Sequence, residues 1–182
     1  MRLLLTLPNL GPSLRSALVR AALEETPSFN HGLGSVLQTP EGLLFTTPDF
    51  PDSDDGDEAR AKLIREILEA AVAINQRILR MFPQLPELYR SKVRFRSEPQ
   101  VGLDVIPDYL TLLHQGGGDC APLGAVRCAE LRSRGIPSGL KVYWRPERTP
   151  LPYHVQVRVV RGSDVDIEDP ARMLGMAGMA AH

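Results

Sequence analysis

The spacing of hydrophobic residues changes along this chain and separates helical from extended segments. Residues 3–7, 35–38 and 43–46 are short apolar runs typical of strands, and Pro40-Glu41-Gly42 supplies turn-forming residues between the last two. Residues 9–25 carry apolar side chains at helical spacing. The first part of the chain is therefore predicted to hold a strand, a helix and a β-hairpin.

The longest periodic segment is residues 57–82, which predicts a helix with one apolar stripe. Asp57 is the expected N-cap, and prolines at 83 and 86 end the pattern. Residues 47–58 are rich in Pro, Asp and Gly and predict a solvated loop. The stripe consists of Ile64, Ile67, Leu68, Ala71, Ile74, Ile78 and Phe82.

The second half of the chain changes from helical to strand periodicity. The predicted elements are a strand at 93–96, helices at 107–114 and 120–134, and strands at 139–145, 154–160 and 164–167. Arg161-Gly162-Ser163 predicts a hairpin between the last two strands. Because helices come first and strands follow, the order favours an α+β fold over a doubly wound sheet.

Composition narrows the class of protein. With 182 residues, 43% of them hydrophobic, the chain can bury a proper core. A net charge of -1 gives no general attraction to nucleic acid or to an anionic membrane. No apolar run approaches the length of a membrane span, and the run at residues 3–7 is too short for a signal peptide. These features predict a cytoplasmic protein that binds neither nucleic acid nor membrane.

The two cysteines are not expected to form a disulfide. Cys120 and Cys128 both fall in the predicted helix 120–134. Eight residues of helix separate them by about 12 Å, whereas a disulfide needs Cα atoms within about 7 Å. Cys128 is expected to be a small buried hydrophobic residue.

Cys120 is the strongest candidate for chemistry, because it opens a predicted helix directly after the glycines 116–118. A helix N-terminus favours the thiolate form, which is the nucleophile. The backbone N–H of Cys120 is a natural oxyanion donor there, and the side-chain amide of Gln115 is a weaker candidate for the same role. Gly118 and Asp119 directly precede the cysteine and are included as supporting residues.

His154 and Asp169 are the expected partners of this cysteine. His154 begins a strand in which Val155, Val157 and Val159 form the core face, so the histidine lies on the polar face. Asp169 follows the next strand and lies in line with two apolar residues, which favours it over Asp166 and Glu168 as the partner of the imidazole. Cysteine, histidine and carboxylate in this order suit nucleophilic catalysis.

Within the predicted central helix, Leu123, Val126 and Ala129 are expected to face the core, and Gly124 to allow a sheet to come close. A metal site is the other chemical interpretation. Cys120, Cys128, His154 and His182 could supply zinc ligands, but the sequence contains no CxxC or HxxxH pair to support one. No metal and no cofactor is therefore predicted.

The motifs Gly118-Asp119-Cys120, His154-Val155-Gln156-Val157 and Glu168-Asp169-Pro170 resemble the transglutaminase-like superfamily, which shares the papain-like cysteine peptidase fold. The run from Tyr89 to Met176 resembles the small transglutaminase-like proteins encoded by bacteriophages and prophages. The resemblance implies a catalytic core at 57–176, with the Cys120 helix packed on an antiparallel sheet. Residues 1–56 are not part of it, and 177–182 are expected to be a flexible tail. One departure is Ala121-Pro122 after the cysteine, where relatives often carry acidic residues.

The expected function is a cysteine-dependent hydrolase of the peptidase or amidase type, acting on a protein or peptide through a Cys120–His154–Asp169 triad and a thioester. The alternatives are a transglutaminase-type acyltransferase with the same triad, or a non-catalytic assembly protein that retains the fold. A phage origin would add a virion-associated location. Between positions 127 and 161 there are eight basic residues and two acidic ones. The commoner interpretation of such charges is a solvated surface, and the alternative is a surface that favours an acidic substrate or partner.

Overall fold

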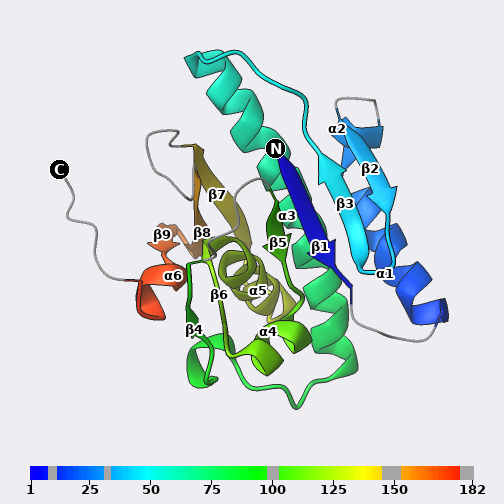
Figure 1. Cartoon of the computed structure of the whole chain (residues 1–182). Helices are drawn as coiled ribbons and strands as arrows, with labels where there is room; N and C mark the ends of the chain where they lie inside the picture. The colour runs from blue at the N-terminus through cyan, green and yellow to red at the C-terminus, as the bar shows by residue number, and fades with distance from the viewer. Residues whose placement is uncertain (8–11, 31–33, 98–102, 145–152, 177–182) are drawn as a thin grey trace.

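The helix that begins at Cys120 is enclosed by other elements on almost every side. This helix, α5 (Cys120–Ser133), packs against α3 (Asp54–Met81), β7 (Ser138–Trp144) and β8 (Tyr153–Arg161) (Figure 1). Every residue from 120 to 131 is buried. The expectation of one core face was therefore too narrow, because α3 and the sheet cover opposite sides of α5 and bury even its charged residues.

The structure is a computed structural model that describes residues 1–7, 12–30, 34–97, 103–144 and 153–176. These residues form a mixed α+β fold with three sheets. The remaining elements are β1 (Arg2–Thr6), α1 (Pro12–Glu24), α2 (Pro27–Asn30), β2 (Ser35–Gln38), β3 (Gly42–Thr46), the 3₁₀ helix η1 (Leu88–Arg90), β4 (Arg94–Phe95), β5 (Asp104–Ile106), α4 (Tyr109–Gln115), β6 (Gly117–Gly118), β9 (Asp164–Glu168) and α6 (Pro170–Met173).

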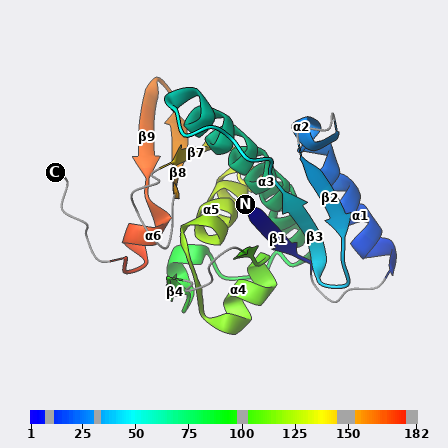
Figure 2. The same ribbon diagram turned by 45° about the horizontal axis from the view of Figure 1, so that its top comes forward.

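The first sheet joins the N-terminal segment to the second half of the chain. Its strand order is β2-β3-β1-β5, and β1 runs parallel to β5, with Leu5 opposite Ile106. The sequence analysis did not predict β5, because three residues between turn-forming neighbours carry too little periodicity. This sheet lies on one side of α3, and α5 with the third sheet lies on the other (Figure 2).

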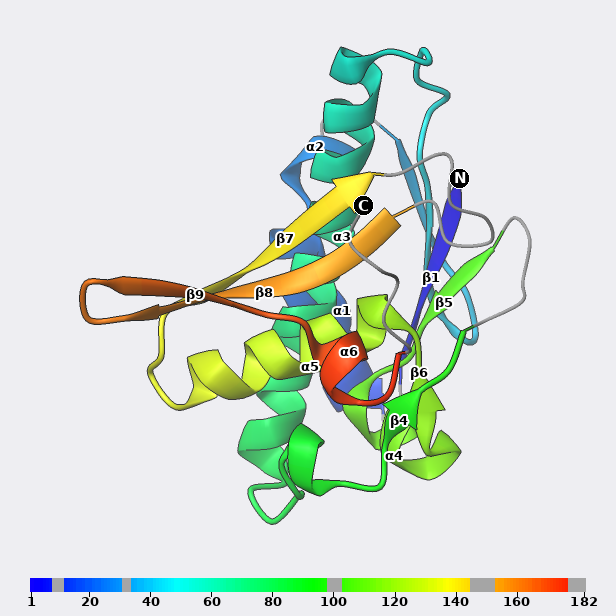
Figure 3. The same cartoon turned by 90° about the vertical axis from the view of Figure 1, so that its left-hand side faces the viewer.

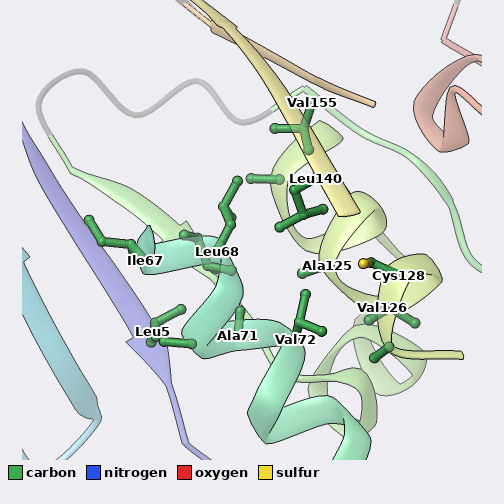
Figure 4. Packing of buried hydrophobic residues seen from close by; sticks show 14 of the residues in the cluster. Leu5, Ile67, Leu68, Ala71, Val72, Ala125, Val126, Cys128, Leu140 and Val155 are labelled. Atoms are coloured by element: carbon green, nitrogen blue, oxygen red, sulfur yellow. The ribbon is translucent and has the colours of Figure 1, made fainter. Parts of the chain in front are cut away.

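Helix α3 therefore forms core on two sides. Leu5 of β1 packs near Ile67 and Ala71 of α3, while Val72 faces Ala125 and Val126 of α5 (Figure 4). These side chains belong to one continuous hydrophobic cluster that extends to Val155 of β8. The stripe predicted at 57–82 is thus core, as expected, but the helix begins earlier.

The start of α3 corrects the predicted cap. Ser53 is the N-cap, and its Oγ accepts a hydrogen bond from the backbone N–H of Gly56 at 3.2 Å. Asp57 lies inside the first turn, where its carboxylate still complements the helix dipole. The predicted loop 47–58 is correspondingly shorter. The predicted helix start at Asn9 and the tail 177–182 lie outside the described residues.

The third sheet, β7-β8-β9, is antiparallel throughout and packs on α5. Gly124 allows this packing. A Cβ at residue 124 would lie 2.6 Å from Cγ1 of Val155, a fully buried side chain of β8. The predicted role of Gly124 in close helix–sheet approach is confirmed. Among the described helices, none combines the length and apolar character that a membrane crossing requires.

We expect Gly124→Ala to lower the free energy of unfolding by about 1–3 kcal/mol, because the added methyl group overpacks the contact with Val155. This loss should outweigh the gain of up to about 1 kcal/mol in helix propensity. Urea denaturation followed by circular dichroism measures it. Gly139→Ala is the matched control, since a Cβ there meets no atom within 4 Å. A Gly124→Ala variant more stable than the wild type would contradict the packing.

Candidate active site

Cys120 occupies the first position of α5, directly after a capped turn. Asp119 is the N-cap, with a buried side chain whose Oδ1 accepts a hydrogen bond from Ala121 N–H at 2.9 Å. Short polar side chains of this kind satisfy the free N–H groups of a first helical turn. The predicted supporting role of Asp119 thus has a definite structural basis, since this residue fixes where the helix starts.

The glycines before Cys120 serve the packing of the chain itself. Gly116 ends α4 at φ 73°, a conformation that favours glycine. Gly118 is buried, and a Cβ there would lie 2.6 Å from Cδ1 of Leu112. The space beside Gly118 is therefore filled by the side chain of Leu112.

The sulfur of Cys120 lies against the start of β8. The residue is only 1% exposed, and its Sγ donates to the backbone carbonyl of Tyr153 at 3.9 Å. The Tyr153 hydroxyl is hydrogen-bonded to the carboxylate of Asp104 on β5. Burial, and after it the charge of Asp119, raise the pKa of the Cys120 thiol well above its ordinary value. The expected helix effect on the thiol is therefore outweighed in this conformation, and the sulfur is held protonated.

His154 and Asp169 are in direct contact. His154 Nε2 lies 2.8 Å from Oδ2 of Asp169, and the Gln156 amide donates to the same oxygen at 3.2 Å. Asp169 is also the N-cap of α6, where its Oδ1 accepts from the backbone N–H of Arg172. Partial burial alone would raise the pKa of Asp169, but the hydrogen bonds from His154, Arg172 and Gln156 lower it. The carboxylate is therefore ionised at neutral pH and orients the imidazole.

Asp169 reaches His154 for a different reason from the one expected. Val165 and Ile167, on the same face of β9, are 50% and 45% exposed, so this face points away from the core. Glu168 points the other way, towards α5. Register explains the contact: β9 pairs with β8 as far as Glu168 opposite Val157, which places Asp169 next to Gln156 and His154.

The end of β9 also makes room for the N-terminus of α5. Pairing between β8 and β9 stops at Val157, whereas β8 extends back to Tyr153 (Figure 3). The Cys120 thiol meets this unpaired edge at Tyr153, the residue next to His154. Among the described residues, no hydrogen bond joins the thiol to the imidazole. The structure thus brings the three predicted residues to one end of the sheet, with His154 and Asp169 already paired.

A buried ion-pair network, which the sequence analysis did not identify, holds β9 to α5. Arg127 Nε donates to Glu168 Oε2 at 2.7 Å, and the side chains are only 11% and 14% exposed. Glu130 and the ring of Tyr89 also contact this guanidinium. Glu168 is adjacent to Asp169, so the network sets the position of the aspartate. An arginine in the middle of an apolar helix was the available signal.

The remaining candidates from the sequence are Gln115 as an oxyanion donor and Cys128 and His182 as metal ligands. Gln115 is exposed at the end of α4, and within the described residues its side-chain amide makes no hydrogen bond near Cys120. The structure therefore gives no support to the amide as an oxyanion donor. Cys128 is buried and, like Cys120, is a free thiol. The described residues contain no group of three potential metal ligands, and His182 lies outside them.

Replacing Glu168 by Gln should lower stability by roughly 2–4 kcal/mol at neutral pH, because the Arg127 charge would be left buried with one weaker partner, Glu130. Asp166→Asn is the control. Its ion pair with Arg161 is about half exposed, so it should cost less than about 1 kcal/mol. Thermal denaturation of both variants provides the measurement.

The same variant has a predicted pH dependence. Partial burial raises the pKa of Glu168, but the hydrogen bond and charge of Arg127, aided by Arg161 and Tyr89, more than reverse this and lower it. The stabilisation is therefore present above the unfolded pKa of about 4.3 and is lost as pH falls through the lower folded value. The stability gap between wild type and Glu168→Gln should narrow below about pH 4. A gap independent of pH would argue against the ion pair.

Comparison with known proteins does not assign this site. No family model, no curated protein and no solved structure matches the chain. The function proposed below rests on the residues of the chain itself.

Proposed function

We propose that the protein is a cysteine-dependent hydrolase of the peptidase or amidase type. Cys120 is the nucleophile, His154 the general base and Asp169 the residue that orients the imidazole. The observation that carries this proposal is the 2.8 Å contact between His154 Nε2 and Asp169 Oδ2. It lies one residue from Tyr153, whose carbonyl accepts a hydrogen bond from the thiol of Cys120 at the first position of α5. This combination matches the roles that nucleophilic catalysis requires.

The contact with Asp169 selects the imidazole nitrogen that would act. Nε2 carries the proton donated to the carboxylate, so Nδ1 of the neutral ring is the base. In the proposed reaction the Cys120 thiol gives its proton to Nδ1 as the sulfur bonds to the amide carbonyl carbon. The tetrahedral intermediate then breaks its C–N bond, and the imidazolium returns the proton to the leaving amine. Water, activated by the same nitrogen, hydrolyses the thioester.

The start of α5 supplies an oxyanion donor. The N–H of Cys120, at the first helical position, has no acceptor within the helix. The next N–H, of Ala121, is already used by Asp119. The developing oxyanion would therefore be stabilised by the Cys120 N–H, in addition to the positive end of the helix dipole.

The finer fold assignment, a transglutaminase-like core of papain type, belongs to the same proposal. Its support is the arrangement of a cysteine helix on an antiparallel sheet, a histidine at the start of a strand, and an aspartate directly after the next strand. A phage or prophage origin, and with it a virion-associated location, follows from that resemblance.

The burial of Cys120 favours the main alternative, a non-catalytic protein that retains the fold. With 1% of the residue exposed and its thiol protonated, a substrate reaches the sulfur only after neighbouring side chains have moved. A catalytic cysteine and a structural one differ in a measurable way, because only the first has a base that removes its proton during attack.

Alkylation of the native protein separates these two functions. We expect iodoacetamide to modify Cys120 roughly 100-fold faster than Cys128 near neutral pH, because His154 acts as general base for the first thiol alone. Cys128 is an internal control. It lies buried in the same helix, burial raises the pKa of its thiol to about 11, and its sulfur lies 3.6 Å from the hydroxyl of Ser138. Mass spectrometry of quenched samples gives both rates.

His154→Ala should remove the difference between the two rates while the urea-unfolded protein reacts equally at both cysteines. Equal, slow alkylation of both cysteines in the native wild type would instead mean that the site is not used for catalysis.

Hydrolysis and acyl transfer differ in the acceptor of the acyl group. With p-nitrophenyl acetate as acyl donor, we expect steady release of p-nitrophenol that Cys120→Ala reduces at least roughly 100-fold. Cys128→Ala should leave it unchanged. A primary amine added in excess should not raise the rate. Faster release with formation of the acetylated amine would identify an acyltransferase.

A further inference from the structure

A cleft of about 750 Å³ lies between the N-terminal half of α3 and strand β7. Figure 3 shows the two elements side by side. Gly139 lines the cleft near the start of β7, and a Cβ there would meet no atom within 4 Å. The cleft does not contain Cys120, His154 or Asp169, and nothing in the proposed reaction uses it.

Four basic side chains line this cleft: Lys62 and Arg65 from α3, Lys141 from β7 and Arg158 from β8. All four residues are exposed, and among the described residues none forms an ion pair. By contrast, Arg132 binds Glu69 at 2.6 Å on the same side of α3. Like charges that form no ion pairs repel one another, and a negatively charged ligand relieves that repulsion.

The remaining lining residues indicate the kind of anion. Asp55 and Glu58 border the cleft at the start of α3, and Leu140 and Val142 add apolar surface. A nucleic acid carries negative charge at every step and would be repelled by the acidic end. A polypeptide can place carboxylates against the cations, a positive charge against Asp55 and Glu58, and apolar side chains between them.

Strand register connects the cleft to the candidate active site. Tyr143 lies opposite His154, Lys141 opposite Gln156, and Gly139 opposite Arg158. Residues directly opposite in a sheet project from the same face, so the imidazole and these two cations share one face. Arg158 lies four residues from His154 along β8, or about 13 Å. An extended peptide covers that distance with about four residues.

We propose that this cleft binds an acidic polypeptide segment and presents the chain beyond it to Cys120. The binding site stands on the lining of the cleft, whereas the presentation to Cys120 rests on the proposed function. The substrate class is then a protein whose acidic stretch begins about four residues from the reacting amide.

Fluorescence anisotropy tests the binding site without turnover. The probe is a fluorescein-labelled peptide of about ten residues, with four glutamates towards one end and a lysine at the other. The parent protein in this assay is the Cys120→Ala variant, which prevents turnover. The double variant Lys141→Glu and Arg158→Glu should bind the probe at least about tenfold more weakly. The matched control, Arg20→Glu with Lys92→Glu, makes the same change in net charge on α1 and before β4, and should bind within about twofold of the parent.

Three results would overturn the site: no binding of the peptide, equal weakening in both double variants, or tighter binding of a single-stranded oligothymidylate of the same charge. The two proposals fail separately. If only the Lys141→Glu and Arg158→Glu variant binds the peptide weakly and Cys120 is not alkylated faster than Cys128, the proposed peptide site stands and the proposed hydrolase function is rejected. If Cys120 is alkylated fast and both double variants bind the peptide equally well, the hydrolase proposal stands and the peptide site is rejected.

Discussion

The close packing of α5 on β8 is the constraint on which the rest of the structure depends. At Gly124 the helix lacks a side chain, and Val155 occupies the space. This contact sets how near the first turn of α5 lies to the start of β8, and therefore where the Cys120 sulfur lies relative to Tyr153 and His154. Helix α3 packs against the opposite side of α5, so the helix that begins with Cys120 lies between α3 and the sheet.

Two further interactions complete the geometry around this contact. The Arg127–Glu168 ion pair holds the end of β9 to α5, which leaves the next residue, Asp169, beside His154. The hydroxyl of Tyr153 is bound by Asp104 on β5, a strand that itself pairs with β1. The candidate site is therefore supported from the N-terminal sheet as well as from the C-terminal one.

The imidazole of His154 is already paired with Asp169 in this conformation, whereas the thiol of Cys120 is buried and out of reach of a substrate. The imidazole of His154, the proposed base, is held by a carboxylate whose pKa is lowered, while the Cys120 thiol keeps its proton because burial raises its pKa. Chemistry at such a site would require proton transfer during attack rather than a standing thiolate. The basic cleft beside α3 fits this view, because a bound chain would supply the binding energy needed to move the side chains over the sulfur.

The spacing of apolar residues, together with turn-forming residues and glycines, predicted the long helix, the Cys120 helix, both hairpins and the α+β class, since these features depend on local sequence. The sequence also indicated Cys120, His154 and Asp169 as a group. The reason given for Asp169, that it lies in line with two apolar residues, was wrong, because that face of β9 is exposed. Strand β5, the enclosure of α5 on almost every side and the Arg127–Glu168 pair could not be predicted. Each depends on contacts between residues far apart in sequence, and so does the pKa of Cys120, which burial by distant elements controls rather than the helix that the cysteine begins.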